Sequence, residues 1–302
     1  MKKITRKIVL IIAIAVFALS CYKLYSIYAE YKAGEKEYEE LIKDVISEEV
    51  VQNPNQGDEN QEEGNQEEGN QEEGNPGEGE GQGSSPGEGA GSGTTGSTQT
   101  TPPKIEPEVI FRVDFNKLFS INKDTVGWIR FKNPSIISYP VVRAEDNDKY
   151  LKTTFEGKKN SAGTIFMDTT NRGDFSDRNT FIYGHNMKNG TMFGQLRKYK
   201  SESFYRANPY FYIYTPDGKE HTYQIFSVAI VDETSDSYQR MYANSMEFEE
   251  YLQKIKARSR YNTGVEVNKD SKIITLSTCT NVTPTQRLLI HAVKISEKVV
   301  GE

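Results

Sequence analysis

Hydrophobic and polar positions divide the chain into an apolar N-terminus, a polar middle and a long strand-forming remainder. An almost unbroken apolar run covers residues 8–22 and partly resumes over residues 24–28. The run is shorter than the ~20 residues that span a bilayer, but Lys23 can reach the interface and nearby tyrosines suit the headgroup region. We therefore expect a membrane anchor over residues 8–28, with a cleaved signal peptide or a lipoprotein site at Cys21 as alternatives.

Charges and periodicity on either side of the anchor indicate its topology. Residues 1–7 contain four basic side chains, which the positive-inside rule keeps in the cytoplasm, so the rest of the chain is expected on the extracellular face. Residues 29–50 place apolar side chains such as Tyr38, Leu41 and Val45 three and four positions apart among charges. This spacing predicts an amphipathic helical stalk.

The middle of the chain has a composition that cannot form a core. Residues 51–103 carry eleven acidic side chains and no lysine or arginine, and they repeat the pentad Asn-Gln-Glu-Glu-Gly before a stretch rich in Gly, Ser and Thr. This composition predicts a disordered, acidic, glycine-rich linker over residues 51–105. The formal net charge of −6 belongs to this linker, because residues 104–302 carry 29 basic and 24 acidic side chains. That balance argues against a nucleic-acid-binding protein.

Residues 106–302 carry the pattern of one β-rich domain. Runs of Val, Ile, Tyr, Phe and Thr bounded by Gly, Pro, Asn and Asp turns predict about eight short strands. A short helix is expected near residues 113–119, and a long helix from Ser237 to Arg260, where apolar residues recur at helical spacing. This order favours a mainly β barrel or sandwich with one inserted helix. The expected strands are 126–131, 139–142, 163–167, 180–183, 210–214, 222–231, 272–277 and 288–295.

Cys279 is the only cysteine of the domain expected outside the cell, so it has no partner there for a disulfide. Such a thiol is either a reactive group or a buried apolar filler. Cys279 ends an apolar run and precedes a turn-rich segment, and strand ends are where nucleophiles become exposed. A functional thiol must ionise, so it needs a neighbouring base or cation.

Three histidines and one arginine are the candidate partners of this thiol. His185 ends a strand and enters a polar loop, which favours a solvent-accessible base, whereas His221 follows a hairpin turn and His291 lies within a strand. Arg287 begins the strand after Cys279, and antiparallel pairing would return its guanidinium to the thiol, where it can stabilise a thiolate or an oxyanion. An ordinary loop histidine and a surface arginine are the alternatives. We expect no metal site, because the histidines and cysteines lack ligand spacing.

Several segments in a fixed order resemble the sortase family. Residues 274–279, Ile-Thr-Leu-Ser-Thr-Cys, are similar to the family signature Thr-Leu-x-Thr-Cys, and Arg287 follows at the expected distance. Residues 183–186, Tyr-Gly-His-Asn, resemble the family's histidine segment, and similarity extends over about residues 110–296. The long helix before the cysteine strand, and the stretch from Asn147 to Leu151, resemble class B sortases.

The resemblance implies an eight-stranded sortase-type β-barrel and a cysteine transpeptidase that needs no metal or organic cofactor. Cys279 would cleave a sorting signal after Thr, of the Asn-Pro-x-Thr-x or a related kind, through a thioester. His185 would act as acid and base, and Arg287 would hold substrate or oxyanion. An amine of peptidoglycan or of its lipid-linked precursor would then accept the surface protein. Similarity also implies the substrate-binding residues Asn147, Leu151, Tyr223, Thr275 and Ser277.

Other functions stay open at this level: a surface cysteine peptidase that releases its acyl group to water, a pilin-polymerising sortase, or a non-catalytic wall-binding module with an inert Cys279. No Asp-Pro-aromatic lid of the pilin-polymerising class lies upstream, which disfavours that class. The acidic repeat is a departure from class B sortases, whose N-terminal helices pack on the barrel. Whether the helix expected over residues 29–50 docks is therefore an open question.

Overall fold

A single long helix opens the chain in the computed structural model. The structure describes residues 2–51, 108–132 and 135–301. Helix α1 (Lys2–Val45) has 44 residues and runs without interruption through the expected anchor into the expected stalk. This stretch contains no proline and only one glycine, so no helix-terminating signal separates the two parts. The expected linker, residues 51–105, lies outside the described residues except for Val51.

The N-terminal elements correct two expectations. The chain's N-terminal helix is long rather than short, although a helix of seven residues, α2 (Phe115–Ile121), does precede the barrel. The stalk helix ends at Val45, and the following residues form strand β1 (Ile46–Val51), which pairs with β2 (Glu108–Val113) in a two-stranded sheet. The β-branched residues Ile46, Val50 and Val51 account for the change, since they favour extended structure more than the preceding helix formers do.

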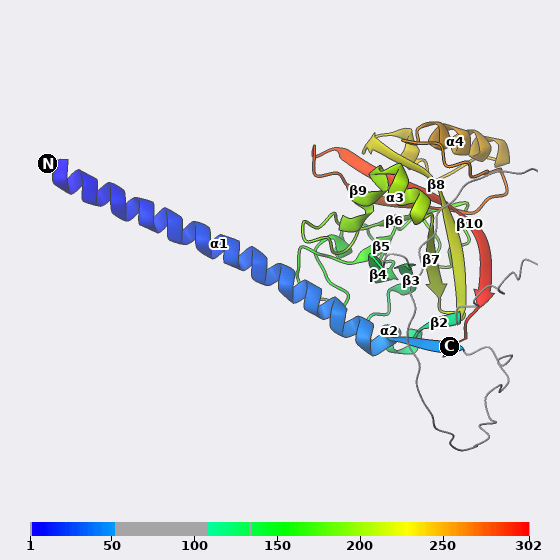
Figure 1. The fold of residues 1–302 in the computed structure, drawn as a ribbon, viewed down its shortest axis with the longest axis horizontal. Helices are drawn as coiled ribbons and strands as arrows, with labels where there is room; N and C mark the ends of the chain where they lie inside the picture. Colours follow the sequence, from blue (N-terminus) through cyan, green and yellow to red (C-terminus); the bar gives the residue numbers. More distant parts are fainter. Residues whose placement is uncertain (1, 52–107, 133–134, 302) are drawn as a thin grey trace, which may run out of the picture. The chain divides into compact units, whose positions relative to one another are not determined.

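Eight strands close into a barrel, which confirms the expected eight-stranded barrel, but the long α1 gives the chain mixed α and β content instead of the expected mainly β content (Figure 1). Their order around the barrel is β10-β8-β7-β3-β4-β5-β6-β9. The β4–β5 and β6–β9 pairs are parallel, and the other pairs are antiparallel. The strands are β3 (Thr125–Phe131), β4 (Ile137–Val142), β5 (Ile165–Met167), β6 (Asn179–Tyr183), β7 (Tyr210–Thr215), β8 (Lys219–Asp232), β9 (Ile273–Cys279) and β10 (Gln286–Val299).

Short helices lie in the connections between strands. The helix expected from Ser237 to Arg260 is shorter in the structure, because α4 begins only after Asn244, whose side chain accepts hydrogen bonds from two backbone amides of the first turn. The residues before this N-cap form a short 3-10 helix and an extended segment. The connecting helices are η1 (Lys149–Leu151), η2 (Gly194–Lys200), α3 (Glu202–Ala207), η3 (Asp236–Tyr238) and α4 (Ser245–Ala257).

Alternation along β9 separates two apolar clusters. Ile274 and Leu276 belong to the main core of the barrel, together with inward-facing residues of β10. Ile273 belongs to a second cluster, in which the apolar face of α4 covers the outside of the sheet. Since successive side chains of a strand point to opposite faces, residues 275, 277 and 279 share the outer face with Ile273. The α4 side chains in this second cluster are Phe248, Tyr251, Leu252 and Ile255.

The last turns of α1 pack against the barrel, which answers the question of docking. Tyr38, Leu41 and Val45 are buried there, whereas the side chains of residues 4–28 are exposed. The exposed part is long and apolar enough to cross a membrane, as an anchor or a signal sequence would be. One helix thus combines a membrane-compatible segment with a segment that belongs to the folded domain.

Candidate active site

Three neighbouring strands bring the segments of Cys279, His185 and Arg287 to one level of the barrel. Cys279 is the last residue of β9, and Arg287 of β10 is its direct antiparallel partner. On the other side, β6 runs parallel to β9 with Tyr183 opposite Ser277. Continuing that register by two residues brings His185 to the level of Cys279. The cysteine is therefore flanked by the histidine segment on one side and by the arginine strand on the other.

The outer face of β9 is accessible only at its end. Thr275 is fully buried under α4, and Ser277 is 4% exposed, with its hydroxyl 2.7 Å from that of Tyr238. Cys279, the next residue on this face, is partly exposed. Of the outer-face residues in this row, the cysteine is thus the one that is not buried, and Ser277 only lines the neighbouring groove.

His185 is oriented by a backbone carbonyl. Its Nε2 lies 2.7 Å from the carbonyl oxygen of Leu151, the last residue of η1. A carbonyl only accepts, so Nε2 carries the proton and Nδ1 is the basic nitrogen of the neutral ring. Gly184 lets this segment approach the barrel, because a Cβ there would lie 2.4 Å from Ile165 and 2.7 Å from Phe193.

Hydrogen bonds tie the histidine segment to the cysteine loop. The hydroxyl of Thr278 donates to the carbonyl of Gly184, and the amide of Asn186 donates to the carbonyl of Cys279, both over 2.7 Å. Asn281, which has a left-handed φ of 61°, donates to the carbonyl of Asn186 over 3.0 Å. These bonds hold the two loops in a fixed relation. The roles of Asn186 and Asn281 cannot be predicted from the local sequence, because their partners lie more than 90 residues away.

The guanidinium of Arg287 is held in place from two sides. Its Nη1 donates to the carbonyl of Pro284 over 2.7 Å, and its Nη2 forms an ion pair with the carboxylate of Glu233. Glu233 follows β8, and its backbone N–H donates to the carbonyl of Thr285 over 2.9 Å. The β8–β10 pairing thus brings an acid to this arginine, a contact that the sequence pattern did not predict.

A groove of about 290 Å³ opens next to the cysteine strand. Two of the predicted substrate-binding residues, Asn147 and Ser277, line it together with Arg287. Its aromatic and charged walls were not predicted from the sequence, and they come from β5, β6 and the segment between β8 and α4. The full lining is Asn147, Phe166, Tyr183, Glu233, Tyr238, Arg240, Ser277 and Arg287.

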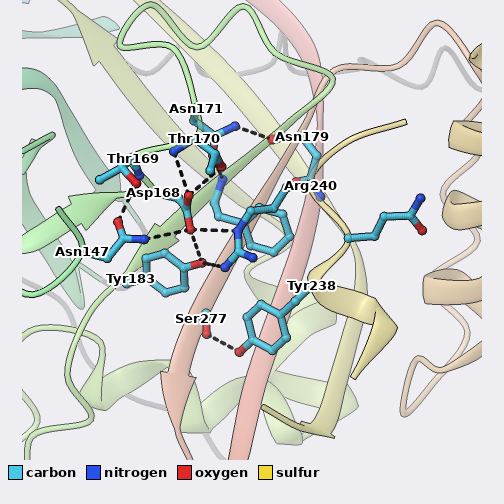
Figure 2. A network of polar contacts seen from close by, with 12 residues as sticks. Asn147, Asp168, Thr169, Thr170, Asn171, Asn179, Tyr183, Tyr238, Arg240 and Ser277 are labelled. Carbon is cyan, nitrogen blue, oxygen red and sulfur yellow. Dashed lines mark hydrogen bonds and ion pairs between the residues drawn. The ribbon is translucent and has the colours of Figure 1, made fainter. Parts of the chain in front are cut away.

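Asp168 is the centre of a polar network beside this groove (Figure 2). The carboxylate is fully buried, and its Oδ2 accepts hydrogen bonds from Tyr183 (2.8 Å), Arg240 (2.9 Å) and Asn147 (3.3 Å). Its Oδ1 accepts from the backbone N–H and the hydroxyl of Thr170 (2.9 and 2.6 Å). Burial by itself raises the pKa of Asp168, but these hydrogen bonds and the charge of Arg240 outweigh burial, so the pKa is lowered. A fixed negative charge therefore holds Arg240 at the groove.

Two tyrosines give the groove neutral hydrogen-bonding walls. Burial raises the pKa of Tyr238 to about 12. Burial, together with the charge of Asp168, also raises the pKa of Tyr183 above its ordinary value. Both phenols therefore stay protonated at neutral pH and can donate as well as accept hydrogen bonds.

Two predicted groove residues lie elsewhere. Tyr223 is 2% exposed and stacks on Phe211 inside the barrel, with ring centroids 5.4 Å apart, so its assignment to the groove is corrected. Thr275 contacts core side chains instead of the groove, since its hydroxyl bonds Asn179 (2.8 Å) and His291 (2.9 Å). Burial lowers the pKa of His291 to about 3, so this histidine is a neutral, packed residue of the strand.

The remaining candidates have distinct positions. Leu151 lies outside the groove lining but supplies the carbonyl that binds the imidazole. His221 is partly buried between Thr215 and Glu297 at the far end of β8, away from the register that contains Cys279. The geometry thus favours His185 over the other two histidines as the partner of the thiol.

Known proteins are similar to this chain over the same region. Residues 133–295 match the sortase domain family. Sortase B of Listeria monocytogenes is 40% identical over 170 residues, which cover 56% of this chain and 68% of that protein. A mutant form of Clostridium perfringens sortase B is structurally similar, with a TM-score of 0.58, 33% identity, and coverage of 61% of this chain and 87% of that chain. A substrate complex of Staphylococcus aureus sortase B has a TM-score of 0.57, 31% identity, and coverage of 61% of this chain and 85% of that chain.

The fold, the candidate site and the similar proteins all indicate the same family. The barrel has the expected eight strands, and the family match covers more than half of the chain. The similar proteins named above are all sortases of class B. The chain therefore belongs to the sortase family, is most like its class B members, and is a cysteine transpeptidase.

Proposed function

We propose that Cys279 is the nucleophile that cleaves a sorting signal of the Asn-Pro-x-Thr-x or a related kind after its Thr. Nδ1 of His185 takes the proton of the thiol, the thiolate attacks the threonine carbonyl, and the tetrahedral intermediate collapses to a thioester. The C–N bond breaks, and the leaving amine takes a proton from the imidazolium of His185. An amine of peptidoglycan or its lipid-linked precursor then gives a proton to His185, attacks the thioester and regenerates the thiolate.

The observation that carries this proposal is the register of β6, β9 and β10. It brings His185 and Arg287 to the level of a partly exposed Cys279 from opposite sides. With Nε2 occupied by the Leu151 carbonyl, Nδ1 is the nitrogen available to exchange protons with the thiol and the amines. Arg287, held by Glu233, supplies donors for the substrate carbonyl or the developing oxyanion.

The groove supports a peptide substrate rather than a small ligand. It is open to solvent, and Asn147 and Ser277 are its predicted peptide contacts. A solved complex of Staphylococcus aureus sortase B contains a substrate, which supports substrate binding on this fold. We also propose that α1 is an uncleaved single-pass anchor that keeps the domain, residues 106–302, on the extracellular face, with residues 51–105 as a spacer.

Ligation by the full-length protein in detergent micelles tests the proposal. The protein is incubated with a sorting-signal peptide and a peptidoglycan-like amine, and we expect a ligated peptide and a mass-trappable acyl adduct on Cys279. Cys279→Ala should abolish both, whereas Cys21→Ala, the matched change of the other cysteine, should leave them unchanged. Exclusive hydrolysis at high amine concentration would show a peptidase instead, and undiminished turnover of Cys279→Ala would exclude the thiol.

A further inference from the structure

The carbonyl that orients His185 lies in the loop between β4 and β5. Within this loop, two backbone hydrogen bonds of 3.0 Å join its outgoing and returning legs on either side of Leu151. One runs from the N–H of Thr164 to the carbonyl of Tyr150, and the other from Asn160 to Lys152. The position of the Leu151 carbonyl therefore depends on the returning leg of the loop.

Helix α1 contacts that returning leg along one face. Glu30 accepts hydrogen bonds from the side chain of Asn160 to its carbonyl (2.8 Å) and from the N–H of Ser161 to its carboxylate (2.7 Å). Two turns later, the buried carboxylate of Glu37 accepts from the N–H of Glu156 over 3.2 Å. The helix thus supports the loop over its whole returning leg.

Tyr38 makes the contact closest to Leu151. Its side chain is 4% exposed, and its hydroxyl donates to the carbonyl of Gly163 over 2.6 Å and lies 3.2 Å from the hydroxyl of Thr164. The same oxygen accepts from the N–H of Phe155 over 3.3 Å. Gly163 is in direct contact with the other leg, because a Cβ there would lie 2.3 Å from the carbonyl oxygen of Tyr150. The phenol therefore bonds the loop next to the residues that flank the carbonyl acceptor.

Tyr38 also supports the segment that carries the imidazole. Its ring packs edge-on against Tyr139, with centroids 5.2 Å apart and planes at 90°. The hydroxyl of Tyr139 accepts a hydrogen bond from the N–H of Met192 over 3.2 Å. Met192 pairs in a β-bridge with Asn186, the residue after His185. One side chain of α1 is thus linked to both the acceptor of the histidine and the loop of the histidine.

We propose that Tyr38 is a positioning residue that keeps the imidazole of His185 hydrogen-bonded to Leu151 and aimed at Cys279. The proposal rests on the proposed function of His185 and extends it to α1, the helix that also contains the membrane-compatible segment. Docking of this helix is then a condition for full turnover and not only a means of attachment.

The test is Tyr38→Phe in the full-length protein in detergent micelles, which removes one oxygen and keeps the ring. Loss of a hydrogen bond that positions a reacting group should lower kcat about five- to tenfold, with KM for the peptide changed less than about twofold. Long-range ¹H–¹⁵N spectra should show His185 as the Nε2–H tautomer in the wild type and as a tautomer mixture in the variant. A merely structural role of Tyr38 would leave that tautomer signal unchanged.

Two controls make the result decisive. Tyr31→Phe removes the same group from the same helix, at a tyrosine for which the described part of the chain provides no hydrogen bond, and should keep wild-type kcat. Adding Tyr38→Phe to His185→Gln should cause no further loss, because the imidazole to be positioned is absent. Wild-type kcat and tautomer in Tyr38→Phe would overturn the positioning role while leaving the proposed function intact. Full turnover by His185→Gln would instead overturn the acid–base function and this proposal with it.

Discussion

Replacing Asp168 by Asn removes the buried negative charge beside the groove with almost no change in volume. The carboxylate accepts five hydrogen bonds, one of them from the charged Arg240. An asparagine amide keeps one acceptor oxygen and turns an NH₂ group toward donors, so at least one buried donor loses its partner. We expect the variant to fold but to be clearly less stable.

The expected decrease in the free energy of unfolding follows from the hydrogen-bond partners of this carboxylate. An unsatisfied buried polar group costs about 1–3 kcal/mol. Arg240 is 36% exposed, so solvent screens its lost ion pair, which adds at most about 1 kcal/mol. Together these effects predict a decrease of about 3 kcal/mol in the free energy of unfolding, which at a urea m-value of about 2 kcal/mol/M lowers the midpoint by roughly 1.5 M.

The assay is urea unfolding of the full-length protein in detergent micelles, followed by the fluorescence of Trp128. This residue is the only tryptophan of the chain and is completely buried in the barrel. The folded-state pKa of Asp168 lies below its ordinary value of 3.8, so its stabilising effect is present above that value and is lost as pH falls through the lower folded pKa. The difference between wild type and variant should therefore be constant near neutral pH and shrink below about pH 4.

The matched control is Asp174→Asn, at an exposed carboxylate that caps one backbone N–H in the same connection. It should change stability by less than about 1 kcal/mol. A midpoint for Asp168→Asn equal to that of the control, or a difference from wild type that persists unchanged at pH 3, would refute the assignment of a stabilising charge to this network.

Three further predictions concern the groove and its support. Gly184→Ala should lower the free energy of unfolding by about 1–3 kcal/mol, measured by thermal unfolding, because its Cβ would overlap the barrel side chains. The ligation rate should fall as well. An unchanged stability and an unchanged rate would contradict the close approach. Glu233→Gln should lower kcat about tenfold by loosening Arg287, and the ligation rate should become less sensitive to salt; an unaltered salt profile would argue against this ion pair. Tyr238→Phe should raise KM for the peptide severalfold while Tyr223→Phe leaves KM unchanged, and steady-state kinetics showing the reverse would place the groove elsewhere.

Much of the fold follows from local patterns in the sequence. The eight barrel strands were predicted because β-branched and aromatic runs bounded by turn residues act over a few neighbours. The long apolar helix was predicted in the same way, although its unbroken length was not. The end of α4 nearest the groove was misjudged, because the capping side chain of Asn244 and the aromatic contacts of the preceding segment override helical spacing.

The sequence by itself determined which reactive residues the domain contains: one cysteine, a histidine at a strand end and an arginine across a turn. Their order along the chain is that of a known family. Only the tertiary structure decided which groups share a surface. Closure of the barrel turned Tyr223 inward and brought Tyr238 and Arg240 to the groove. The tertiary structure likewise brought Tyr38 into contact with a loop more than 100 residues away in the chain. Strand pattern is a local property, whereas such neighbours depend on register and closure, which no short window of sequence contains.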